Sequence, residues 1–183
     1  MATEAERGGW SGPWAGRVAY LALAALLLAI PLLPLNILPR PYAAPDILLG
    51  VTAAWAARRP DTLPVLVVAG VFLLADLLFQ RPPGLLTALV VILTEWLRRR
   101  APRLRRGSFL VEWVTVGAGI ALVAAAERLL LAAVLTPQAP LGLTLIQAIL
   151  TVATYPLVAG IAQGALGLRR PAQGEVDALG HRL

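Results

Sequence analysis

Four ionisable side chains lie inside or at the ends of strongly apolar stretches: Asp46, Asp76, Glu127 and Arg128. A charge at the centre of a bilayer costs about 2.5 to 3.5 kcal/mol on insertion scales, so such residues tend to pair, line a cavity or do chemistry. Two acids on facing helices could hydrolyse a bond within the membrane, and Asp46 with Asp76 is the only candidate pair. Asp76 and Arg128 could instead form an ion pair that orders the helices. The remaining alternative is that each charge reaches the nearest lipid headgroups.

The residues of most catalytic sites are scarce. The sequence has no cysteine and no lysine, His181 is its only histidine, and Ser11 and Ser108 are its only serines. Disulfides and thiolate chemistry are therefore excluded, and a Ser-His-acid triad or a Schiff-base lysine is not expected. No phosphate-binding loop or metal-ligand spacing occurs. We expect a protein that is not an enzyme and that needs no cofactor and no metal.

Composition indicates that the elements carrying these charges lie in lipid. The chain is 58% hydrophobic and 14% charged, with a mean hydropathy of +0.76, whereas about a quarter of the residues of soluble domains are charged. A hydrocarbon core takes about 20 helical residues, so 183 residues provide about six spans. We expect one all-α domain, a six-helix membrane bundle, and a flexible cytoplasmic tail over 169–183. The apolar runs are 18–35, 46–57, 64–79, 85–97, 109–135 and 143–168.

The runs 46–57 and 85–97 are short for a complete span, at about 18 to 20 Å of helix. Interfacial residues could extend them, they could lie partly within the protein, or the bilayer could thin around them. Re-entrant half-spans are a further alternative. The run 18–35 is expected to be a retained anchor, because no convincing cleavage site follows it.

Arginine placement predicts the orientation. If the N-terminus is cytoplasmic, all arginines except Arg40, Arg81 and Arg128 lie on the inner side, as the excess of positive charge in cytoplasmic loops requires. Both termini are then cytoplasmic, and the four ionisable residues lie in the outer third of the membrane. The densest group of arginines is expected to lie in a cytoplasmic loop that fixes the topology. This loop could bind anionic lipid or a cytoplasmic partner, and we do not expect it to bind nucleic acid. It contains Arg98, Arg99, Arg100, Arg103, Arg105 and Arg106.

Glycine and proline positions predict how the helices turn and pack. Gly84 closes the sequence QRPPG, which indicates a tight outer turn. Pro156 is expected to kink the last span and free a backbone carbonyl. Gly160 and Gly164, in GIAQG, have the spacing that permits close helix contact, and glycines also occur in the sequence GAG at 117–119. The alternative is that small residues are simply abundant in this chain.

The order of these motifs resembles a known family. PDILLGVTAAWAARRPDTLP (45–64), then ADLLFQRPPG (75–84), and the proline-bearing TYPLVAGIAQ of the last run are similar to MreD, the small membrane subunit of the bacterial rod-shape system. The resemblance covers the chain in length, span count and orientation. Many members have glycine four residues before and four residues after the Asp-Leu-Leu aspartate, where this chain has Phe72 and Gln80.

The resemblance implies a non-enzymatic, multi-pass scaffold of the bacterial cytoplasmic membrane that serves cell elongation and peptidoglycan synthesis. Its expected partners are a membrane-anchored periplasmic protein like MreC, then RodA with a class B penicillin-binding transpeptidase, with MreB indirectly, and membrane lipids. The family is similar in fold to S components of energy-coupling factor transporters, whose cavity opens outward. On that basis Asp46, Asp76, Glu127 and Arg128 would line a vestibule that a partner segment enters. The alternatives are a substrate-binding subunit of a vitamin-type transporter and a lipid-domain or assembly protein.

Overall fold

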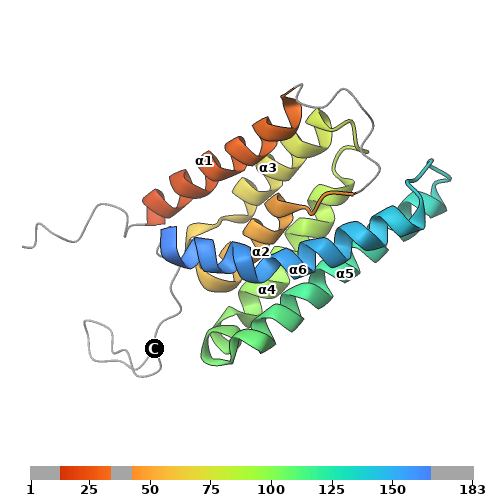
Figure 1. The fold of residues 1–183 in the computed structure, drawn as a ribbon. Coiled ribbons are helices and arrows are strands. Elements are labelled where there is room, and N and C mark those ends of the chain that lie inside the picture. The colour runs from red at the N-terminus through yellow and green to blue at the C-terminus, as the bar shows by residue number, and fades with distance from the viewer. Residues whose placement is uncertain (1–12, 34–42, 166–183) are drawn as a thin grey trace, which may run out of the picture.

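The computed structural model describes residues 13–33 and 43–165, and the regular structure of these ranges consists of helices only (Figure 1). The expected all-α fold is confirmed for these ranges, and each α-helix lies on one of the six apolar runs. The predicted tail over 169–183 lies outside them. The helices are α1 (Pro13–Leu32), α2 (Ile47–Arg58), α3 (Val65–Leu78), α4 (Leu85–Arg106), α5 (Phe109–Ala133) and α6 (Leu141–Ala165), with a 3-10 turn, η2 (Pro60–Thr62).

Three of these helices are long and apolar enough to cross a membrane: Trp14–Leu32, Phe109–Ala133 and Leu141–Gly164. Their outer faces expose large apolar side chains, for example Leu122 at 71% and Ile149 at 64%. Soluble monomers rarely expose apolar patches on this scale, whereas lipid is the natural solvent for them. These helices give the chain the character of a helical membrane protein.

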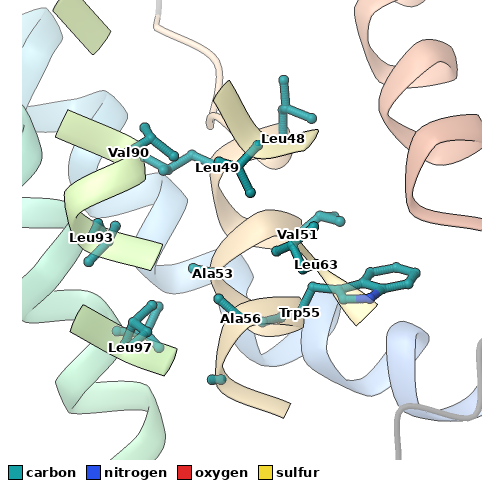
Figure 2. Packing of buried hydrophobic residues seen from close by; sticks show 14 of the residues in the cluster. Leu48, Leu49, Val51, Ala53, Trp55, Ala56, Leu63, Val90, Leu93 and Leu97 are labelled. Atoms are coloured by element: carbon teal, nitrogen blue, oxygen red, sulfur yellow. The ribbon is translucent and has the colours of Figure 1, made fainter. Parts of the chain in front are cut away.

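Helix α2 lies at the centre of the bundle. All its residues from Leu48 to Arg58 are buried, and it contacts α1, α4, α5 and α6. Figure 2 shows Val90, Leu93 and Leu97 of α4 on one side of α2 and Trp55 on another. A helix that is apolar all round is buried within a protein. The shortness of the run 46–57 therefore reflects a helix enclosed by its neighbours.

Helix α4 continues to Arg106, well beyond the predicted end of its run at residue 97. The expected basic loop is therefore wrong, because its arginines lie on the last turns of this helix. The cause is an apolar stripe at helical spacing, Leu97, Ala101 and Leu104, which is buried against the bundle. The arginines lie around this stripe, and the guanidinium of Arg100 lies 4.2 Å from the centre of the Trp96 ring. The residues concerned are Arg98, Arg99, Arg100, Arg103, Arg105 and Arg106.

Glycines bring α5 close to its neighbours, which lie beside it in Figure 1. A Cβ on Gly117 would come within 3.0 Å of Val152 Cγ1 on α6, and one on Gly119 would come within 2.4 Å of Leu93 Cδ1 on α4. By contrast, a Cβ on Gly160 or Gly164 would meet nothing within 4 Å among the described residues. The prediction of close packing at Gly160 and Gly164 is therefore wrong within this part of the chain, since this face of α6 has no neighbouring helix.

Pro156 lies inside α6 and frees a carbonyl, as predicted. Proline has no N–H, so the carbonyl four residues earlier, that of Val152, loses its helical partner. The indole Nε1 of Trp113 donates a hydrogen bond to this oxygen at 2.8 Å. A side chain of α5 thus replaces the missing backbone donor of α6 and joins the two helices.

Candidate functional site

A cavity of about 300 Å³ lies where α4 begins, between α2, α4, α5 and α6. Helix α5 contributes one face, because residues three and four positions apart lie on the same side of a helix. The α5 residues are Ile120, Val123, Ala124, Glu127, Arg128 and Leu131. Helix α6 contributes Thr144, Gln147, Ala148 and Thr151. The starts of α2 and α4 and the two adjoining connections add Asp46, Leu49, Arg81, Pro82, Leu86, Pro137, Gln138 and Ala139. We call this space the α5–α6 cavity.

Three of the four ionisable residues singled out in the sequence line the α5–α6 cavity: Asp46, Glu127 and Arg128. Asp76 does not belong to its lining. The structure therefore brings together the charges of α2 and α5, and it places the charge of α3 elsewhere.

Asp76 is fully buried and accepts hydrogen bonds from the start of α4. Its Oδ2 accepts from the Gly84 amide at 3.0 Å, from the Thr87 amide at 3.3 Å and from the Thr87 hydroxyl at 2.8 Å. Gly84 is the N-cap residue of α4 and has no side chain to accept the Thr87 amide, so Asp76 of the preceding helix takes that role. The carboxylate also lies at the end of the helix dipole that favours negative charge.

These contacts overturn both interpretations of Asp76. The predicted pair of Asp76 with Arg128 is wrong, because Asp76 Oδ2 takes its donors from the start of α4. The Arg128 guanidinium donates to Ala139 and Thr144 instead. The second carboxylate oxygen, Oδ1, is buried and has no hydrogen-bond partner among the described residues. The headgroup alternative is also wrong, since the side chain is 0% exposed.

The turn after α3 is held at both ends by Asp76. Its backbone oxygen accepts from the Arg81 amide at 2.9 Å, and its side chain accepts from Gly84. Gly84 has a φ of 88°, a left-handed conformation that glycine adopts without strain. The predicted turn at Gly84 is therefore confirmed.

Arg128 holds the connection between α5 and α6. Its Nη1 donates to the Ala139 carbonyl and to the Thr144 hydroxyl, both at 3.0 Å. These bonds fix the loop over 134–140 against the beginning of α6. The Arg128 guanidinium thus helps to hold two residues of the cavity wall in place.

Asp46 connects the beginning of α2 to α6. Its Oδ1 accepts from the Leu49 amide at 2.9 Å, which caps α2. Its own amide donates to Thr151 Oγ1 at 2.9 Å, and that hydroxyl donates to the Gln147 carbonyl at 2.7 Å. The polar groups of Asp46 and Thr151 therefore serve the fold as well as the cavity wall.

Four polar side chains of the cavity remain uncommitted. Within residues 13–33 and 43–165, no hydrogen bond or ion pair is made by the side chains of Arg81, Glu127, Gln138 and Gln147. Arg81 lies 5.5 Å from the centre of the Phe79 ring. A charged and amide-bearing set of this kind can bind a ligand, since its hydrogen-bonding capacity is not used by the fold.

A second polar cluster lies in the core, and the sequence analysis did not predict it. Arg58 Nε donates to Glu112 Oε1 at 2.8 Å, and Arg58 Nη1 donates to the Ala159 carbonyl at 2.8 Å. The Tyr155 hydroxyl donates to the same Glu112 oxygen at 2.7 Å. The available signal was that Arg58 ends the second run while Glu112 begins the fifth, so both lie at the same depth with opposite charge.

The structure does not bring together Asp46 and Asp76, the candidate pair of acids for bond cleavage. Asp46 lines the α5–α6 cavity whereas Asp76 is buried behind the start of α4, so the two acids do not face a shared space. In the part of the chain that the structure describes, no group of three or more His, Asp and Glu side chains could hold a metal ion.

No protein family matches the chain, and comparisons with curated proteins and with solved structures found no match either.

Proposed function

We propose that the chain is a non-enzymatic scaffold subunit of a membrane complex and takes a segment of a membrane-anchored partner into the α5–α6 cavity. The observation that carries the proposal is that Asp46, Glu127 and Arg128 line one space whose walls combine charged, amide and apolar side chains. The uncommitted side chains of Arg81 and Glu127 leave polar capacity for an occupant.

The sequence resemblance to MreD supplies the partner and the process. The partner is an MreC-like periplasmic protein, and the complex is the cell-elongation machinery with RodA and its transpeptidase, with MreB connected indirectly. In this proposal the chain lies in the bacterial cytoplasmic membrane.

The same proposal gives the chain six spans, with both termini in the cytoplasm and the cavity facing outward. Its support comes from α4, whose 22 residues correspond to about 33 Å of helix. Leu86 of the cavity lies at the first turn of α4 and Arg103 lies at the last. Leu86 and Arg103 are therefore about 26 Å apart along the helix, which approaches the thickness of a hydrocarbon core, roughly 30 Å.

Filling the cavity tests the proposal. Ala124 lines the cavity, whereas its neighbour Ala125 is exposed on the outside of α5. We expect Ala124→Phe to reduce co-purification of the MreC-like partner from membranes at least tenfold, and the matched Ala125→Phe variant to leave it unchanged. Both variants are compared at equal amounts of monodisperse protein. Equal partner recovery with both would rule out the cavity as the partner site.

A second candidate function is substrate binding for a vitamin-type transporter. The observation that favours it is the cavity volume of about 300 Å³, which lies at the lower end of the range for small-molecule sites. Native mass spectrometry separates the two candidates. A small molecule retained by the wild-type protein and lost from Ala124→Phe, with partner recovery unchanged, would favour the transporter function.

A further inference from the structure

The charges of the α5–α6 cavity point to the chemistry of its occupant, and this step rests on the proposed function. We propose that the cavity receives a cationic ammonium or guanidinium group, with the carboxylate of Glu127 as its counter-ion. In the scaffold function this group belongs to a lysine or arginine side chain of the partner segment.

The fold itself uses two of the four charges that line the α5–α6 cavity. The carboxylate of Asp46 caps α2, and the guanidinium of Arg128 holds Ala139 and Thr144. Each of these two charges has hydrogen-bond partners inside the chain. Glu127 and Arg81 have none among the described residues, and the ion pairs there join Arg58 with Glu112 and Glu95 with two arginines of α4.

Of these two charges, Arg81 has a favourable contact within the chain and Glu127 lacks a direct partner in the part of the chain that the structure describes. Arg81 lies in the turn between α3 and α4, and the Phe79 ring is 5.5 Å from its guanidinium, a cation–π contact that favours the charge. Glu127 lies within α5, half-buried, with Ala124 and Leu131 on the same face of the helix. Arg81 lines the same cavity and attracts this carboxylate, whereas Asp46 and Asp76 repel it. No ion pair joins Glu127 to any of the described residues, and a partly buried carboxylate without a direct partner is unfavourable. The missing group is therefore a cation.

The size and the walls of the cavity suit a cation that is carried on an apolar stem. A volume of about 300 Å³ accommodates one long side chain or a small amine, at the lower limit of ligand pockets. Leu49, Leu86 and Ile120 provide apolar wall for a methylene stem, which is how lysine and arginine bury their stems beside a charged head. Gln138 and Gln147 offer amide oxygens that can accept N–H groups of the same cation.

Lysine-like probes with matched uncharged controls test the assignment. The purified full-length chain in lipid nanodiscs is titrated with N-acetyl-lysine-methylamide and with its norleucine and glutamate counterparts, and the unfolding midpoint is followed by tryptophan fluorescence. We expect the lysine probe to raise the midpoint in a saturable manner, and the norleucine probe to need at least tenfold higher concentration for the same shift. No shift, equal shifts from lysine and norleucine, or a larger shift from glutamate would overturn the proposal.

Two variants assign the effect to one carboxylate. Glu127→Gln is nearly isosteric and is expected to fold, because Glu127 makes no hydrogen bond within the described ranges, and it should remove the preference for lysine over norleucine. Glu95→Gln is the matched control, since Glu95 lies near the arginine-rich part of α4, 3.5 Å from Arg99, and it should keep the preference. A preference that survives Glu127→Gln would contradict the assignment.

The same variants distinguish failure of this inference from failure of the proposed function. If Ala124→Phe reduces partner recovery while Glu127→Gln does not and lysine has no advantage, the scaffold function stands and the cationic occupant is wrong. If lysine binds through Glu127 but neither variant changes partner recovery, the site takes a free small amine and the scaffold function is wrong. If Glu127→Gln lowers both lysine binding and partner recovery, the cation belongs to the partner.

Discussion

Arg58 Nε and Glu112 Oε1 are 2.8 Å apart, and both side chains are only 2% exposed. This ion pair joins the end of α2 to the start of α5, and Tyr155 adds a hydroxyl donor from α6. Burying two charges is expensive, but removing one partner is worse because it leaves the other charge uncompensated. The pair therefore makes the packing of the central helix depend on the correct placement of both α5 and α6.

Removing the carboxylate should accordingly destabilise the whole bundle. We expect Glu112→Gln to lower the free energy of unfolding by about 3 to 5 kcal/mol, because the Arg58 guanidinium then stays buried without a counter-ion. Tyr155→Phe removes one hydrogen bond and should cost about 1 to 2 kcal/mol. SDS-induced unfolding in mixed micelles, followed by tryptophan fluorescence, measures both changes.

The control for this prediction is the solvent-accessible pair of Glu95 with Arg99, in which the Arg99 side chain is 79% exposed. Glu95→Gln should change the free energy of unfolding by at most about 1 kcal/mol, as is typical of exposed ion pairs. If Glu112→Gln proves as mild as Glu95→Gln, the buried pair does not hold the helices together.

Asp76 provides a second prediction, on the start of α4. Asp76→Ala should lower the free energy of unfolding by about 1 to 3 kcal/mol, because the Gly84 and Thr87 amides lose their acceptor in an apolar setting. Thr87→Val removes only the hydroxyl donor and should cost less. SDS-induced unfolding in mixed micelles measures the difference in the free energy of unfolding between the two variants.

The structure also predicts that the double replacement Asp76→Arg with Arg128→Asp will not recover stability. Asp76 is bonded to α4, and Arg128 to Ala139 and Thr144. Exchanging the charges therefore breaks two separate sets of contacts, and the double variant should be less stable than either single variant. Recovery in the double variant would mean that the two side chains interact after all.

The sequence predicted the positions of these groups along their helices better than it predicted their partners. Apolar runs define how far along a helix Asp46, Glu127 and Arg128 lie, and the three do share one cavity. The direction in which each helix faces is decided by packing, which the runs do not specify. The sequence therefore favours pairing Asp76 with Arg128, because the two charges neutralise each other, although backbone amides at a helix start can also bind a carboxylate.

The arginines were misread for a related reason. Read as a topology signal, the segment from Arg98 to Arg106 looks like a loop, because charge dominates its composition. The segment is helical because Leu97, Ala101 and Leu104 form a buried apolar stripe. In the sequence these three residues are interspersed with arginines, so the stripe is difficult to recognise. Arg58 also looks like a topology signal in the sequence, although its side chain forms a buried ion pair with Glu112 of α5.

Cysteine labelling tests the orientation on a chain without native cysteine. We expect Arg81→Cys to react with a membrane-impermeant maleimide added to intact spheroplasts, because the positive-inside rule places this turn outside. Arg103→Cys, near the other end of α4, should react only after permeabilisation. Permeabilised samples, in which both positions react, control for accessibility. Reaction of both positions from the same side would contradict the six-span arrangement.

The bond from Trp113 to the Val152 carbonyl allows a sharper test, because Pro156 is the reason that this oxygen lacks a helical donor. Trp113→Phe should lower the free energy of unfolding by about 1 to 3 kcal/mol, since it leaves a carbonyl unpaired in an apolar region. In Pro156→Ala the alanine amide can donate to Val152, as in an unbroken helix, so the same Trp113→Phe change should cost less. A double-mutant cycle measures this coupling. If the two substitutions are additive, the indole does not replace the donor that proline removes, and the contact between α5 and α6 must draw its stability from packing at Gly117 instead.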